Sequence, residues 1–173
     1  MDTFAEAAVL KRLRTLFPLL SRCQHALHSE PTDQYNCIAF VFGDDENCWW
    51  PYPAEDEAMG LSLWPRGAPL QETVSAFQKA FELQGFRPCE TGALEVGLEK
   101  IVLYCKPPNE PTHAAKQITD GPHAGQWLSK LGEDVDIRHE TPEALESPLY
   151  GKVSAYFSRA RSRTGKKAGA TAS

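Results

Sequence analysis

The stretch QYNCIAFVFG, residues 34–43, changes abruptly from polar to apolar residues at Cys37. The run before it contains Pro31 and Asp33 and is typical of a turn. The apolar run after it predicts a helix that begins at Cys37. Unpaired backbone N–H groups and the helix dipole at such a position favour a thiolate over a thiol. Cys37 is therefore a candidate nucleophile, and the alternative interpretation is a small residue of the hydrophobic core.

The composition is that of one ordinary globular domain. The chain has 173 residues, 42% of them hydrophobic and 24% charged, which is enough for a sizeable core. The net charge of −5 gives no reason to expect nucleic acid or an anionic membrane as the main partner. No apolar run approaches the roughly 20 residues that span a bilayer, and the first residues lack the order of a signal peptide.

The five cysteines are odd in number and contain no C-x-x-C pair. Without an export signal, reduced thiols in the cytoplasm are the expectation. The histidines are well spread and have no second ligand at helical or hairpin spacing, so we expect no metal site and no cofactor.

Residues 1–30 are expected to form an N-terminal helical extension. Apolar residues recur every three or four positions from Val9 to Leu20, and basic residues occupy the other face. Pro18 should end or kink this helix. A second helix is predicted over residues 69–84, with Pro69 in its first turn and Gly85 after its end.

From residue 98 the pattern becomes that of a sheet. Residues 100–105 read KIVLYC, typical of a central strand buried on both faces. Residues 112–118 and 126–131 predict two further strands, so that an antiparallel meander of three is expected. A short strand is expected at 86–89, a charged connection at 132–140, a short helix after Thr141, and a last strand or helix at 150–156.

Two further regions have open interpretations. Trp49 and Trp50 follow an acidic loop, where they either cover the core or form a wall of a substrate cleft. Residues 158–173 contain five basic residues and no acidic one, which predicts a disordered basic tail. Such a tail either stays in solvent, folds back on the acidic body or makes weak contact with nucleic acid.

His113 is the candidate partner of Cys37. It begins the second predicted strand, whose alternation places His113 and Gln117 on one face. A neighbouring imidazolium keeps a thiolate ionised and later protonates the leaving group. The pair therefore predicts attack on an amide or another acyl group.

Five blocks of the chain resemble a family of mainly bacterial, uncharacterised domains of unknown function over residues 31–157. The blocks are YNCIA (35–39), KIVLY (100–104), THAAKQ (112–117), WLSKLG (127–132) and DIRH (136–139). The order of elements, with a cysteine heading a helix and a histidine on a sheet strand, resembles the papain-like superfamily and its small cell-wall amidase branch. This resemblance implies an α+β fold with N-terminal helices packed on an antiparallel sheet.

The resemblance also implies a polar residue that orients the histidine, and a hole for the oxyanion. Ser129 and Asp136 are the main candidates for the orienting residue, and the others are Gln117, Gln126 and Asp134. The Cys37 N–H is the expected oxyanion donor, with a side-chain amide from Asn36 or Gln34. Lys130 is interpreted as a solvated or ion-paired surface lysine, and His139 as a capping or surface residue before Thr141.

These residues predict a cysteine-dependent hydrolase or acyl-transfer enzyme that acts on a peptide, a cell-wall peptide or a protein glutamine. The alternative is a catalytically inactive papain-like fold that serves as a binding module of a toxin or immunity type. We expect a monomer of the cytoplasm with a peptide or protein substrate, no membrane partner, and nucleic-acid contact only weakly through the basic tail.

Overall fold

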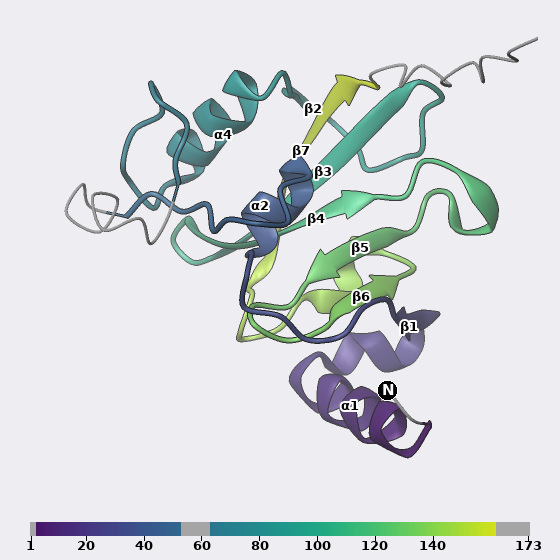
Figure 1. Cartoon of the computed structure of the whole chain (residues 1–173). Helices are drawn as coiled ribbons and strands as arrows, with labels where there is room; N and C mark the ends of the chain where they lie inside the picture. The colour runs from purple at the N-terminus through teal and green to yellow at the C-terminus, as the bar shows by residue number, and fades with distance from the viewer. Residues whose placement is uncertain (1–2, 53–62, 162–173) are drawn as a thin grey trace, which may run out of the picture.

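A computed structural model describes residues 3–52 and 63–161 of the chain. Seven strands form one antiparallel sheet in the order β1-β6-β5-β4-β3-β7-β2 (Figure 1). The strands are β1 (His25–Leu27), β2 (Arg87–Cys89), β3 (Leu98–Lys106), β4 (Glu110–Gln117), β5 (Trp127–Lys130), β6 (Asp136–His139) and β7 (Lys152–Ala160). The helices are α1 (Thr3–Leu16), α2 (Cys37–Phe42) and α4 (Val74–Leu83), with 3-10 turns η1 (Pro18–Arg22), η2 (Gly121–His123) and η3 (Pro142–Leu145). None of the helices within these two ranges is long and apolar enough to cross a membrane.

Strand β3 lies inside the sheet, between β4 and β7, and is buried on both faces. Val102 and Tyr104 belong to one hydrophobic cluster, and Ile101 and Leu103 belong to another. This division follows from the alternation of side chains along a strand. The predicted central strand is confirmed.

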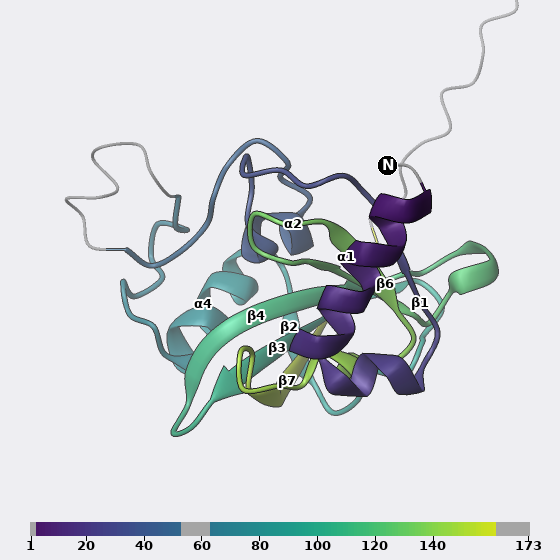
Figure 2. The ribbon, with the colours of Figure 1, turned by 90° about the horizontal axis from the view of Figure 1, so that it is seen from below.

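Different helices cover the two faces of the sheet: α1 and α4 lie far apart in Figure 1, and β4 runs between them in the view of Figure 2. One cluster combines α1 and η1 with strand residues; we call it the α1 face, and it contains Leu13, Phe17, Leu20, Tyr104, Trp127, Ile137 and Tyr150. The other combines α2 and α4 with strand residues; we call it the α2 face, and it contains Cys37, Ile38, Phe77, Phe81, Leu103, Ala114 and Phe157.

The helices follow the sequence signals closely except at one end. The helical extension expected over residues 1–30 is wrong in part, because His25–Leu27 form strand β1 and pair with β6. Helix α1 ends at Leu16 and η1 begins at Pro18, as expected for proline. Helix α2 begins at Cys37, which confirms the predicted start. Helix α4 begins at Val74, not near Pro69, because the Thr73 hydroxyl caps it by accepting from the Ala76 N–H at 3.3 Å.

The predicted meander is confirmed, since β3, β4 and β5 are successive neighbours in the sheet. The short strand near residue 87 is also present, as β2 at the edge. The charged connection expected over 132–140 is wrong in part, because residues 136–139 form β6 between β5 and β1. Ile137 and His139 are buried in the core there. Burial of these two side chains stabilises a strand even though charged residues lie beside them in the sequence.

The C-terminal strand extends into the predicted tail. Strand β7 continues to Ala160, where the Arg159 Nε donates to Glu99 Oε1 at 2.6 Å. Arg161 forms a salt bridge with Asp120, also at 2.6 Å. Residues 158–160 are therefore strand, and the remainder of the predicted tail from 162 lies outside the described residues. The α+β class with an antiparallel sheet is confirmed.

Candidate functional site

Cys37 is the first residue of α2, and its side chain is only 7% exposed. The preceding Asn36 caps the helix, since its Oδ1 accepts from the Ala39 N–H at 3.0 Å. Burial raises the pKa of the Cys37 thiol to about 11, and hydrogen bonds from the N–H groups of Ala114, Cys37 and Ile38 act in the opposite direction. Because α2 has six residues, the helix dipole adds little. In this conformation Cys37 is a buried thiol.

His113 lies on β4 and points to the α1 face, where its ring is stacked on Tyr150. The two ring centroids are 4.1 Å apart and the planes differ by 1°. Both ring nitrogens are buried and have no hydrogen-bond partner. Burial is the main cause that lowers the pKa of His113 to about 3, with a smaller contribution from His139. His113 is therefore neutral at physiological pH.

The predicted hydrogen-bonded pair of Cys37 and His113 is not formed in this conformation. Cys37 packs in the α2 face with Ala114, whereas the ring contacts of His113 belong to the α1 face. The strand alternation explains this, because successive residues of β4 point to opposite faces. The two segments are nevertheless neighbours, because Cys37 and Ala114, the next residue after His113, belong to the same buried cluster.

Ser129 is paired with His139, not with His113. The Ser129 Oγ and the His139 Nε2 are 2.9 Å apart, and the His139 Nδ1 is 2.8 Å from the Thr141 carbonyl oxygen. Both side chains are fully buried, so the interpretation of His139 as a surface residue was wrong. Burial lowers the pKa of His139 to about 4. The pair crosslinks neighbouring strands β5 and β6.

The other candidates for an orienting residue also have partners elsewhere. Asp136 Oδ2 accepts from the Tyr35 hydroxyl at 3.1 Å, and Asp136 Oδ1 is buried without a partner. The Gln117 Nε2 donates to the Gly92 carbonyl at 2.6 Å. Neither residue bonds to His113.

Of the two residues predicted to bind the oxyanion, Asn36 is held by the fold and Gln34 is exposed. The Asn36 side chain clamps Trp49: Nδ2 donates to the Trp49 carbonyl at 2.9 Å, and Oδ1 accepts from the Trp49 N–H at 3.1 Å. Its oxygen and one of its two N–H groups are thus used by the fold, and both bonds hold the side chain against Trp49 and the start of α2. Gln34 is exposed, and its backbone N–H donates to the Thr32 Oγ1 at 3.2 Å.

Trp49 and Trp50 cover the core of the α2 face. Trp49 packs edge-on against Phe42 at 5.2 Å, and its Nε1 donates to Asp44 at 2.7 Å. Trp50 packs edge-on against Phe77, and its Nε1 donates to Glu72 at 2.6 Å. These contacts agree with the core-covering interpretation.

Sequence reasoning missed a buried polar cluster beside α2. Lys130 is fully buried, contrary to the expectation of a surface lysine, and its Nζ donates to the Thr32 carbonyl at 2.7 Å. The ammonium also lies 5.3 Å from the centre of the Tyr35 ring. Lys116 donates to the Phe40 carbonyl at 3.1 Å, which ties α2 to β4. The block W-x-S-K contained a signal for this position. Adjacent residues of a strand point to opposite faces, so with Ser129 on the α1 face Lys130 lies on the α2 face.

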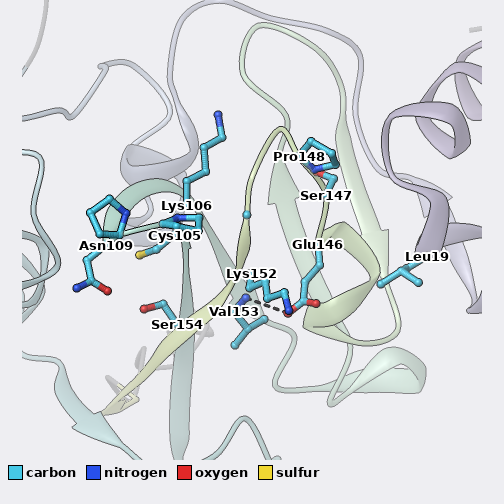
Figure 3. Close-up of a pocket in the computed structure, with 13 residues that line it drawn as sticks. Leu19, Cys105, Lys106, Asn109, Glu146, Ser147, Pro148, Lys152, Val153 and Ser154 are labelled. Atoms are coloured by element: carbon cyan, nitrogen blue, oxygen red, sulfur yellow. Dashed lines mark hydrogen bonds between the residues drawn. The ribbon is translucent and has the colours of Figure 1, made fainter.

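A hollow of about 650 Å³ lies at the end of β3 and the start of β7 (Figure 3). Its walls are mainly apolar, and the Glu146 Oε1 in it accepts from the Val153 N–H at 3.0 Å. Neither Cys37 nor His113 lines it. The residues that do are Leu19, Cys105, Lys106, Pro107, Pro108, Asn109, Glu146, Ser147, Pro148, Gly151, Lys152, Val153 and Ser154.

Within residues 3–52 and 63–161, no group of three or more histidine, cysteine, aspartate or glutamate side chains is arranged to hold a metal ion. Comparison with curated proteins found no match, and neither did comparison with solved structures. A family model described as a domain of unknown function (DUF7689) matches residues 26–158. The match includes Cys37, His113 and Lys130, and it leaves α1 and η1 outside. Because it covers more than half of the sequence, the chain belongs to the DUF7689 family.

Proposed function

We propose that this chain is a cysteine-dependent hydrolase or acyl-transfer enzyme of the papain-like kind, with Cys37 as nucleophile and His113 as its base. The carrying observation is the position of Cys37, which is the first residue of α2 and packs in the same cluster as Ala114. Ala114 directly follows His113 on β4, so the thiol lies next to the strand segment that bears the histidine. Because the His113 side chain points to the other face of the sheet, its imidazole reaches the thiol only if β4 rearranges locally and the ring leaves Tyr150.

The chemistry would proceed in two steps. His113 takes the thiol proton, the Cys37 sulfur attacks the carbonyl carbon of an amide, and the C–N bond breaks as the imidazolium gives its proton to the leaving amine. Water, or a second amine in acyl transfer, then attacks the thioester and releases Cys37. The Cys37 backbone N–H serves as a donor to the oxyanion. Asn36, whose amide is bound to Trp49, acts here by holding the start of α2.

In this proposal the described conformation is a resting form. Its thiol is buried and its histidine is neutral, so activation requires that His113 leave the Tyr150 ring. Ser129 and Asp136 support the site from β5 and β6 through their own partners, His139 and Tyr35.

The test is the rate of alkylation of each cysteine by iodoacetamide against pH, resolved by peptide mass spectrometry. The parent is compared with His113→Ala, and Cys105, also buried, is the internal control. We expect a Cys37 midpoint near or below the reference value of about 8.5, which is lost in His113→Ala while Cys105 is unchanged. A Cys37 midpoint near 11 that is the same in the parent and in His113→Ala would overturn the proposal.

A second candidate function is favoured by one observation, the burial of both Cys37 and His113. In this candidate the same fold is a non-catalytic binding module. Cys37→Ala would then leave the biological effect of the protein intact, whereas loss of that effect with retained folding would exclude the module.

For either function we infer a peptide or protein partner, a monomeric state and a reducing cytoplasmic environment. Weak nucleic-acid binding through the basic residues after 157 would disappear when the chain is truncated at Ala160. Binding that survives this truncation would exclude the tail as its cause.

A further inference from the structure

Lys130 is buried in a way that stability alone does not explain. Its side chain is 0% exposed, and its Nζ donates to the carbonyl oxygens of Thr32 and Asp134. In the described part of the chain no carboxylate lies within salt-bridge distance of this ammonium. Lys100, the other fully buried lysine, has Glu95 at 2.5 Å. A buried charge without a close counter-ion destabilises a fold, so a functional reason for it is worth seeking.

The position of Lys130 supplies that reason. Lys116 on β4 pairs with Leu128 on β5, and continuing this antiparallel register places Lys130 opposite Ala114. Ala114 packs in the same buried cluster as Cys37. The ammonium also contacts the segment that leads into Cys37, through the Thr32 carbonyl and the Tyr35 ring. Burial is the largest cause that acts on the pKa of Lys130 and lowers it, whereas the charges of Asp136, Asp134, Asp33 and Cys37 act to raise it.

We propose that Lys130 is the cation that stabilises the negative form of Cys37, and that it acts as a positioning residue of the site. The catalytic purpose of this interaction rests on the proposed function. The interaction between Lys130 and the Cys37 thiolate can be measured without any activity assay. The sequence analysis assigned this role, keeping the Cys37 thiolate ionised, to the imidazolium of His113. A lysine fits it better in this conformation, because Lys130 and Cys37 belong to the same face of the sheet, whereas the neutral ring of His113 is stacked on the other.

Other charged groups around the pair set the sign of the effect. Asp136 lies directly opposite Lys130 in the β5–β6 register, and Asp33 and Asp134 also interact with the ammonium. Near Cys37, the charge of Cys48 acts to raise the pKa of the thiol, and Cys37 in turn acts on the pKa of Tyr150. The aspartates weaken the positive potential at the sulfur, so removing Asp136 and removing Lys130 should have opposite effects.

The test is the pH dependence of Cys37 alkylation in Lys130→Met, Lys130→Arg, Asp136→Asn and, as the matched control, Lys100→Met. Circular dichroism and a thermal melt of each variant establish that it is folded. We expect the Cys37 midpoint to rise by at least one pH unit in Lys130→Met, which is about a tenfold lower rate below the midpoint. Lys130→Arg should restore most of this rate, Asp136→Asn should lower the midpoint, and Lys100→Met should leave it unchanged.

A purely structural role for Lys130 predicts a different pattern. Lys130→Met and Lys100→Met would both lower the melting temperature, and neither would move the Cys37 midpoint, which would overturn the assignment. If Lys130→Met does not fold, an unchanged midpoint in Asp136→Asn overturns it instead. A shift that depends on Lys130 but not on His113 would support the assignment and contradict the proposed His113 base.

Discussion

The ring of His113 lies flat on the ring of Tyr150, with centroids 4.1 Å apart and planes within 1°. Tyr150 also contacts Phe17, at a centroid distance of 5.1 Å. It therefore joins the histidine of β4 to the segment between α1 and η1. The stack fixes His113 as a neutral, unbonded ring in the core of the α1 face.

Replacing Tyr150 should separate the effect of its ring from that of its hydroxyl. Tyr150→Phe keeps the stack and should change the free energy of unfolding by less than about 1 kcal/mol. Tyr150→Ala removes a buried aromatic ring and should reduce it by about 3–5 kcal/mol. Urea denaturation of the two variants measures both values. Equal losses would mean that the hydroxyl, not the stack, carries the stabilisation.

Stability should fall on the acid side of neutrality because of His113 and His139. Their pKa values in the fold are lowered to about 3 and about 4, whereas an unfolded histidine has a pKa of about 6.5. Below that value the unfolded chain binds two more protons than the folded one. The stabilisation is therefore complete above about pH 7 and decreases by about 4 kcal/mol by pH 5.

Urea denaturation at pH 7.5, 6 and 5 measures this slope. A His139→Gln variant should be less stable at neutral pH, because Ser129 loses its partner, and should lose about half of the pH dependence. An equal slope in the parent and in His139→Gln would show that His139 is not a source of the acid sensitivity.

Asn36 should be important for stability through both halves of its amide. Its Oδ1 caps α2 and its Nδ2 donates to the Trp49 carbonyl at 2.9 Å. Asn36→Ala should destabilise the fold by about 1–3 kcal/mol, since a cap and a partly buried hydrogen bond are both lost. Asn36→Asp keeps the cap acceptor and should lose less. A thermal melt in which Asn36→Asp is the more damaging change would contradict this order.

Gly151 is a position where any side chain should be excluded. It has a φ of +75°, and a Cβ atom would lie 2.0 Å from the Cys105 carbonyl oxygen. Since that neighbour is backbone of a central strand, it cannot move away cheaply. Gly151→Ala should destabilise the chain by more than about 3 kcal/mol or prevent folding.

Gly132 is the matched control for Gly151. It also has a positive φ, +63°, but nothing lies within 4 Å of a Cβ built there. Gly132→Ala should therefore lose only about 1–2 kcal/mol, the backbone strain alone. Similar melting temperatures for the two variants would mean that strain, not the close approach to Cys105, explains Gly151.

Local sequence patterns determined much of the fold. The change of polarity at Cys37 predicted the start of α2, because the Asn36 cap is a local interaction. Proline 18 predicted the end of α1, and the continuous apolar run at 100–105 predicted a strand buried on both faces. Each of these depends on residues that are close in sequence. The family membership likewise follows from the sequence.

Only the tertiary structure decided which side chains meet. Alternation predicted that His113 and Ala114 point to opposite faces, but it could not tell which face would receive α2 and Cys37. The burial of Lys130 and the pairing of Ser129 with His139 needed the placement of β6, which sequence patterns had assigned to a connection. These contacts join segments up to about a hundred residues apart, and their energies come from packing and desolvation in a shared core. Such energies depend on the whole arrangement, and no local pattern specifies them.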